Sequence, residues 1–187
     1  MALENAMGPG QYGPVLVRYY LELGRPAHVV EEVLTQDPQG WLPELVQATS
    51  RWGTDLVSRV GLSVGGHRVD REVNVRVFAL YRLGDTSVIP IAWHPSVESS
   101  MLPSLEGDIE LSPLGDDRAQ LAISASYRPP LGWLGAVSDR ALMRRVAEAT
   151  IKDFLDRVAG RLEANLAQAE SDSAGITAIP PPDIAVR

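Results

Sequence analysis

Hydrophobic and polar residues alternate along Val15–Leu23. One face of this stretch would carry Val15, Val17, Tyr19, Leu21 and Leu23. A period of two with β-branched and aromatic residues is typical of a strand with one buried face. We therefore predict that the first element of the chain is a β-strand.

A helical pattern follows this strand. Gly24, Arg25 and Pro26 interrupt the alternation, and Pro26 suits the first turn of a helix over residues 27–36. Residues 37–40 (DPQG) predict a turn. The segment WLPELVQAT after it predicts a second short helix or an irregular segment, in which Pro43 must lie early.

Hydrophobic and polar residues alternate again in the middle of the chain, in short runs separated by turn residues. We predict strands over 54–62, 71–82, 86–94, 105–114 and 119–127, with turns at 63–67, 84–85 and 115–117. Pro90 lies inside one of these runs and indicates an edge strand or a bulge. Short strands joined by hairpin-length turns predict an antiparallel, meandering sheet.

The last third predicts one long helix, over residues 134–168. One side of this helix would carry an apolar stripe, and the opposite side would carry charged residues. The stripe consists of Met143, Ala147, Thr150, Ile151, Phe154 and Val158. The charged residues are Arg145, Glu148, Lys152 and Asp156. Such a helix needs a broad apolar partner, and the predicted sheet supplies it.

The stretch Tyr127–Gly135, YRPPLGWLG, joins the last strand to this helix. Its two prolines end the strand by removing ladder donors, and its glycines permit the turn. We expect a single α+β domain over residues 14–168, with a flexible leader over 1–13 and an extended or disordered tail over 169–187.

Composition narrows the class of protein. The net charge of −7 argues against a nucleic-acid partner, and the absence of cysteine excludes disulfides and thiolate metal sites. The N-terminal residues lack a signal-peptide pattern, and no apolar run approaches the roughly 18–20 residues of a membrane span. We expect a soluble, cytoplasmic protein without a cofactor.

The chain resembles the START-like family, also called Bet v 1-like or SRPBCC, over about residues 14–166. The resemblance rests on the first strand, the RPAHVVEEVL helix, the Trp41 segment and the ending LEGDIELSPLGDDRAQLAISASYRPPLGWLGAVSDRALMRRVAEATIKDFLDRVAGRL. It implies a helix-grip fold, in which a curved sheet wraps a long C-terminal helix. Members enclose a cavity there for lipids, sterols or polyketides; some are enzymes, and many only bind.

Catalytic patterns are weak. GPGQYG matches a dinucleotide motif but precedes the first strand and opens no helix. The histidines His28, His67 and His94 lack metal-ligand spacing, so we expect no metal. His94 ends a strand and is a candidate general acid or base, and Tyr81 is a second candidate. The alternative is an ordinary half-exposed histidine.

Two polar strand faces have simpler interpretations than catalysis. Glu106, Asp108 and Glu110 share a face of one predicted strand, and a carboxylate pair can transfer protons only when one member is desolvated. We expect all three to be solvated. Ser124 and Ser126 share a face of the last strand, without the G-x-S-x-G sequence of a nucleophile elbow.

The predicted concave surface supplies the candidate ligand-binding residues. They are Val75, Val77, Tyr81, Ile91, Trp93, Ile109, Ile123, Tyr127, Met143, Ile151 and Phe154, with Trp133 as a lid at the mouth. The alternative is a plain packed core. The tyrosines would orient a ligand through their hydroxyls.

Three functions remain open. The first is binding or transport of a hydrophobic or amphipathic small molecule, such as a lipid or polyketide. The second is a cyclase or aromatase activity in the same cavity. The third is a protein-interaction subunit whose tail, ITAIPPPDIAVR, docks on a partner protein.

Overall fold

The computed structural model describes residues 14–36, 38–42, 46–47, 55–64, 67–95, 104–128 and 140–176. In chain order the elements are β1 (Val15–Leu23), α1 (Ala27–Thr35), α2 (Pro38–Trp41), β2 (Val46–Gln47), β3 (Asp55–Val64), β4 (His67–Val77), β5 (Tyr81–Leu83), β6 (Thr86–Pro95), β7 (Ser104–Pro113), β8 (Ala119–Arg128) and α3 (Arg140–Ile176). This is the α+β order that the sequence predicts.

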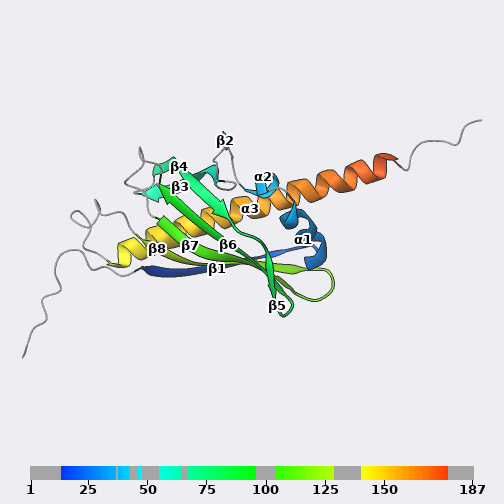
Figure 1. Ribbon diagram of the computed structural model, residues 1–187, viewed down its shortest axis with the longest axis horizontal. Helices are drawn as coiled ribbons and strands as arrows, with labels where there is room; N and C mark the ends of the chain where they lie inside the picture. Colours follow the sequence, from blue (N-terminus) through cyan, green and yellow to red (C-terminus); the bar gives the residue numbers. More distant parts are fainter. Residues whose placement is uncertain are drawn as a thin grey trace, which may run out of the picture.

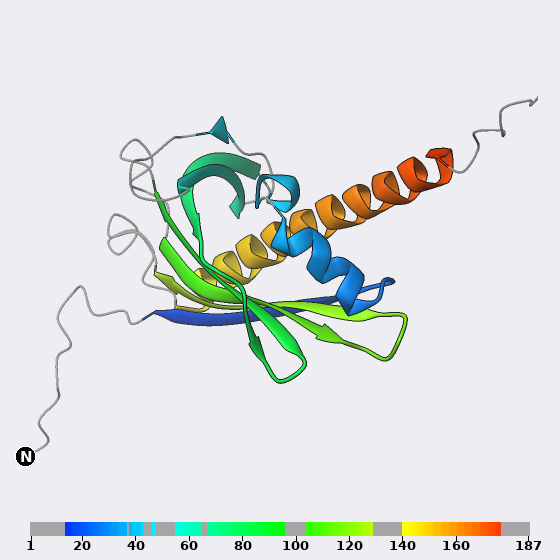
Figure 2. The ribbon, with the colours of Figure 1, turned by 45° about the vertical axis from the view of Figure 1, so that its right-hand side comes forward.

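The strands form one antiparallel sheet in the order β1-β8-β7-β6-β4-β3-β2, with β5 paired to β6. The sheet curls around the first half of α3, and the last turns of α3 extend beyond it (Figures 1 and 2). α3 packs against both β1 and β3, which lie near opposite edges of the sheet. The curved sheet therefore grips the helix, which confirms the predicted helix-grip architecture.

One hydrophobic cluster fills the space between the sheet and the helices. The rings of Trp93 on β6 and Phe154 on α3 meet edge to face at its centre, 5.2 Å apart. The predicted stripe on α3 is confirmed where side chains are described, since Ala147, Thr150 and Ile151 are buried. The Thr150 hydroxyl donates to the Val146 carbonyl, so its burial leaves no polar group unpaired.

Polar contacts fasten α3 to β1. The Tyr19 hydroxyl donates to Asp156, and the Lys152 ammonium lies 5.1 Å from the centre of the Tyr19 ring. Lys152 also donates to Asp156, and this hydrogen bond is the main cause of the raised pKa of Lys152. These contacts lie on the exposed side of α3, so they orient the helix more than they stabilise it.

The strand predicted over residues 71–82 is wrong in its second half. β4 ends at Val77, residues 78–80 are irregular, and β5 begins at Tyr81. Pro90 explains the break. β6 is internal and not an edge, but β5 pairs only with its residues 86–88 and β4 only with its residues 91–95. Neither β4 nor β5 pairs with β6 at Pro90, so the missing N–H of Pro90 leaves no hydrogen bond to these strands unmade. The Pro90 carbonyl accepts a hydrogen bond from the Phe78 N–H.

Other boundaries also differ from the prediction, and the predicted turn at 63–67 is too long, because β3 continues to Val64 and β4 begins at His67. The second short helix is Pro38–Trp41, where the sequence predicted a turn, and Val46–Gln47 is a short strand. α3 continues to Ile176, so residues 169–176 are helical and not part of an extended tail. Residues 167–172 of α3 are exposed, because the helix has passed the edge of the sheet (Figure 1). Residues 1–13 and 177–187 lie outside the described part of the chain.

Among the described residues, no helix is both long and apolar enough to cross a bilayer.

Candidate functional site

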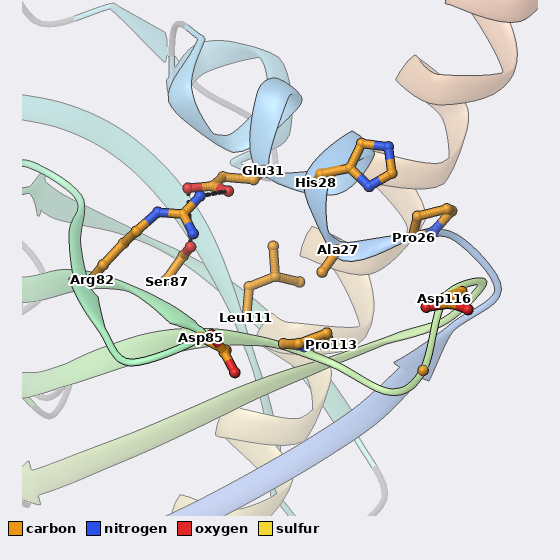
Figure 3. A pocket seen from close by; sticks show the side chains of 11 residues that line it. Pro26, Ala27, His28, Glu31, Arg82, Asp85, Ser87, Leu111, Pro113 and Asp116 are labelled. Atoms are coloured by element: carbon orange, nitrogen blue, oxygen red, sulfur yellow. Dashed lines mark hydrogen bonds and ion pairs between the residues drawn. The ribbon is translucent and has the colours of Figure 1, made fainter.

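A pocket of about 460 Å³ opens between α1 and the ends of two hairpins, β5–β6 and β7–β8 (Figure 3). We call it the α1 pocket. Its lining residues are Pro26, Ala27, His28, Glu31, Arg82, Asp85, Ser87, Leu111, Pro113, Gly115 and Asp116. Three segments that are distant in the sequence therefore form its walls.

The base of the α1 pocket is apolar. Leu111 points from β7 toward α1, with Ala27 and Pro113 beside it (Figure 3). Leu111 is only 2% exposed and belongs to the hydrophobic cluster between sheet and helices. Its face of β7 is the face that carries buried Leu105 and Ile109. The pocket thus begins at the surface and ends on the concave apolar side of the sheet.

Polar groups hold one wall of the α1 pocket in place. Glu31 on α1 pairs with Arg82 on β5 and accepts a hydrogen bond of 3.0 Å from the Ser87 hydroxyl on β6. The Glu31 side chain is 17% exposed and that of Arg82 is 59% exposed, so the pair extends from the wall of the pocket to its rim. The His28 ring points away from the pair, toward the solvent side of α1 (Figure 3). Glu31 therefore ties the first helix to the β5–β6 hairpin.

The turn between β7 and β8, which forms part of the α1 pocket's rim, depends on one glycine. Gly115 lies between β7 and β8 with a φ of 77°, a left-handed conformation that glycine adopts without strain. The Leu114 N–H donates to the Arg118 carbonyl and closes this turn. The rim of the α1 pocket is thereby fixed next to Asp116.

A second pocket, of about 590 Å³, lies along β1, β7 and β8, and we call it the outer pocket. Its lining residues are Leu16, Val17, Arg18, Glu106, Gly107, Asp108, Ser124, Ala125, Ser126, Arg144 and Glu148. Gly107 is close-packed in its wall, because an added Cβ would lie 2.5 Å from the Ser124 carbonyl oxygen. Three adjacent, hydrogen-bonded strands form most of this pocket, and Arg144 and Glu148 of α3 complete its lining.

The three carboxylates on β7 share the polar face that the sequence predicts, but they differ in environment. Glu106 is exposed, whereas Glu110 is half-buried and accepts from Arg18 and from the Ser124 hydroxyl, both at 2.9 Å. Partial burial, with Glu110 nearby, raises the pKa of Asp108 above its ordinary value. The Ser124 hydroxyl is thus oriented by the Glu110 carboxylate, which also pairs with Arg18.

No family model and no curated protein matches the sequence. Solved structures do match. A conserved protein from Geobacillus kaustophilus is 14% identical, with a TM-score of 0.54 over 80% of this chain and 96% of its own. A protein from Thermus thermophilus is 16% identical, with a TM-score of 0.51 over 81% of this chain and 99% of its own.

The chain has the helix-grip fold. Its element order and sheet order show this architecture, and the two matched structures share the overall fold across about four-fifths of this chain. A START superfamily protein from Mycobacterium smegmatis also matches, at 17% identity and a TM-score of 0.47, over 81% of this chain and 99% of its own. At these identities the matches establish the fold and nothing finer.

Most of the predicted ligand-binding residues lie inside the helix-grip core. The fully buried ones are Val75, Ile91, Trp93, Ile109, Ile123, Tyr127, Ile151 and Phe154, and Val77 is half-buried. They form one cluster but line neither described pocket. Burial raises the pKa of the Tyr127 hydroxyl, which keeps it neutral and able to donate. Their ligand-binding role stays a prediction.

Tyr81 is a correction to the predicted concave face. It is 48% exposed on the short strand β5, because the break after Val77 ends the alternation that placed it with Val75. His94 is exposed near the end of β6 and lines neither described pocket, so its role in proton transfer stays a prediction. Trp133 lies outside the described residues, as does the side chain of Met143.

Sequence reasoning missed the residues that form the α1 pocket. Glu31 meets Arg82 and Ser87 across 51 and 56 positions of the chain. No local periodicity signals such a contact; the alternation in β6 could have drawn attention only to Ser87, a polar residue next to buried Val88. Within the described part of the chain, no group of three or more potential ligands is placed to hold a metal ion.

Proposed function

We propose that this protein binds a hydrophobic or amphipathic small molecule, which enters through the α1 pocket and extends into the helix-grip interior. The observation that carries the proposal is Leu111, a core residue that also forms the base of a surface pocket. A volume of about 460 Å³ lies within the roughly 300–1,000 Å³ of small-molecule sites.

The walls of the α1 pocket favour an amphipathic molecule. Burial of apolar ligand surface against Leu111, Ala27 and Pro113 would supply the driving force, at roughly 25 cal/mol per Å². The polar rim at Glu31, Arg82 and Asp116 would leave the ligand's polar end in contact with water and charged groups. Such a division of surface matches a molecule with one apolar and one polar end.

The attachment of α1 gives the ligand a way in. α1 is nine residues long, and Glu31 is its described link to the β5–β6 hairpin. A single ion pair that is partly exposed contributes on the order of 1 kcal/mol or less. The contacts of Glu31 with the hairpin can therefore open without breaking any sheet ladder.

The test is a titration with N-phenyl-1-naphthylamine, a neutral fluorescent probe whose emission rises in apolar surroundings. We expect a saturable rise in emission with one site per chain and competition by neutral amphipathic molecules. A rise that stays linear over the whole titration, or that persists after thermal unfolding, would refute binding in a folded pocket.

A further inference from the structure

A single buried donor in the described core lacks an acceptor. Trp41, the last residue of α2, is 0% exposed, and its indole Nε1–H makes no hydrogen bond with any described residue. An unpaired buried donor costs about 1–3 kcal/mol, and folded proteins keep very few of them. Such a group needs a physical reason.

The position of Trp41 is held from two sides. α2 packs against α3 and α1, and the Asn165 side chain donates 2.8 Å to the carbonyl of Gly40, the residue before Trp41. Leu42, the residue after it, is fully buried as well. The indole therefore cannot turn outward to water without breaking the corner between α2 and α3.

Trp41 and the α1 pocket lie at opposite ends of the same helix. The pocket touches Ala27 and Glu31 in the first half of α1, and α2, which ends at Trp41, follows the end of α1 in the chain. The inner side of α1 between them is apolar, with Val30 and Leu34 buried. Nine residues of helix span about 13 Å, a distance that an elongated small molecule can bridge.

We propose that Trp41 marks the inner end of the ligand site and donates its indole N–H to a neutral oxygen acceptor of the bound molecule. This inference rests on the proposed function. The acceptor is uncharged, as in a ketone, ester or ether, because the buried polar residues described in the core are Ser87 and Thr150 alone. Neither carries a charge that could balance a carboxylate or phosphate.

A pair of probes isolates this hydrogen bond. Benzylacetone and butylbenzene have similar length and shape, and differ in a carbonyl that replaces one methylene group. Their affinities are measured by displacement of N-phenyl-1-naphthylamine from the wild type and from Trp41→Phe. We expect the ratio of ketone to hydrocarbon affinity to fall by roughly 2- to 10-fold in Trp41→Phe, the effect of one neutral hydrogen bond.

The control is Leu42→Ala, which perturbs the packing of the next fully buried position without removing a hydrogen-bond donor. A purely structural effect would weaken both probes equally and leave the ratio unchanged in either variant. A second measurement needs no variant. In NMR spectra of the wild type, the indole N–H proton resonance of Trp41 should move downfield when benzylacetone binds and should not move when butylbenzene binds.

The outcomes separate the two proposals. If the wild type binds the fluorescent probe and both competitors, but the affinity ratio and the Trp41 resonance do not respond to the carbonyl, the role of Trp41 is refuted and the proposed function stands. If the wild type binds none of these molecules, the proposed function fails and the inference fails with it.

Discussion

The α1 pocket and the outer pocket are similar in size but differ in what holds their walls. A helix and two hairpin ends surround the α1 pocket, joined by the contacts of Glu31 with Arg82 and Ser87. The outer pocket lies mainly on three strands whose backbones form continuous ladders, β1 with β8 and β8 with β7. Side-chain contacts open at low cost, whereas a sheet ladder does not. Pocket volume alone therefore does not identify the site at which a ligand can enter.

The largest expected effect comes from filling each pocket with the same side chain. Ala27→Trp places an indole in the α1 pocket, where we expect the affinity for N-phenyl-1-naphthylamine to fall by more than about tenfold, a loss above ~1.4 kcal/mol. The matched control is Ser126→Trp in the outer pocket, with an expected change below about twofold. Equal losses in the two variants would remove the distinction between the pockets.

Gly107→Ala tests how closely the outer pocket's wall is packed. The added Cβ would lie 2.5 Å from the Ser124 carbonyl oxygen and 2.7 Å from the Ala125 Cβ, so backbone must shift. We expect a loss of about 1–3 kcal/mol in the free energy of unfolding, measured by urea denaturation.

Gly115→Ala is the matched change at the rim of the α1 pocket. Nothing lies within 4 Å of its added Cβ, and its φ of 77° alone should cost about 1–2 kcal/mol. If Gly107→Ala were neutral, the outer pocket's wall would be more adaptable than its ladder indicates.

Glu31→Gln weakens the attachment of α1. It removes the charge that pairs with Arg82 and keeps an oxygen for Ser87, so we expect a loss of about 1 kcal/mol in unfolding free energy. Stopped-flow release of the fluorescent probe should become faster. Glu110→Gln breaks the comparable pair with Arg18 on the outer face, and its release rate should match that of the wild type. Identical release rates in both variants would argue against entry beside α1.

Asp108→Asn should give the smallest effect. The raised pKa means that the folded state holds the Asp108 proton more tightly than the unfolded state does. The contribution of Asp108 to stability therefore falls as pH rises through the raised pKa. The asparagine variant should lack this decrease and gain less than about 0.5 kcal/mol at neutral pH relative to the wild type. Urea denaturation at about pH 4 and pH 7 measures the difference in unfolding free energy between the variant and the wild type. A variant that is less stable than the wild type only at neutral pH would contradict this expectation.

The sequence predicted the elements with strong periodicity. The alternation of Val15–Leu23 matches β1, and the stripe through Ile151 and Phe154 matches the buried side of α3, because burial on one face imposes these periods directly. The prediction failed where contacts with a neighbouring strand determine the structure. The alternation continues through Ala79 and Tyr81, yet the strand breaks there, opposite the missing donor of Pro90 on β6.

The pocket was harder to predict than the fold for the same reason. The predicted ligand-binding residues share a face of the sheet or of α3, and the structure places them in the core. The residues that form the α1 pocket come from one helix and two hairpins, and long-range contacts bring them together. The donor of Trp41 could not be recognised without knowledge of its burial and its missing acceptor.

Native mass spectrometry of the purified protein, followed by denaturing extraction, tests the central claim most directly. Binding of a hydrophobic or amphipathic molecule predicts an added mass that is lost on denaturation, or one that forms after incubation with a mixed library of lipids and aromatic compounds. The bare mass of the chain, unchanged after such incubation, would contradict the claim.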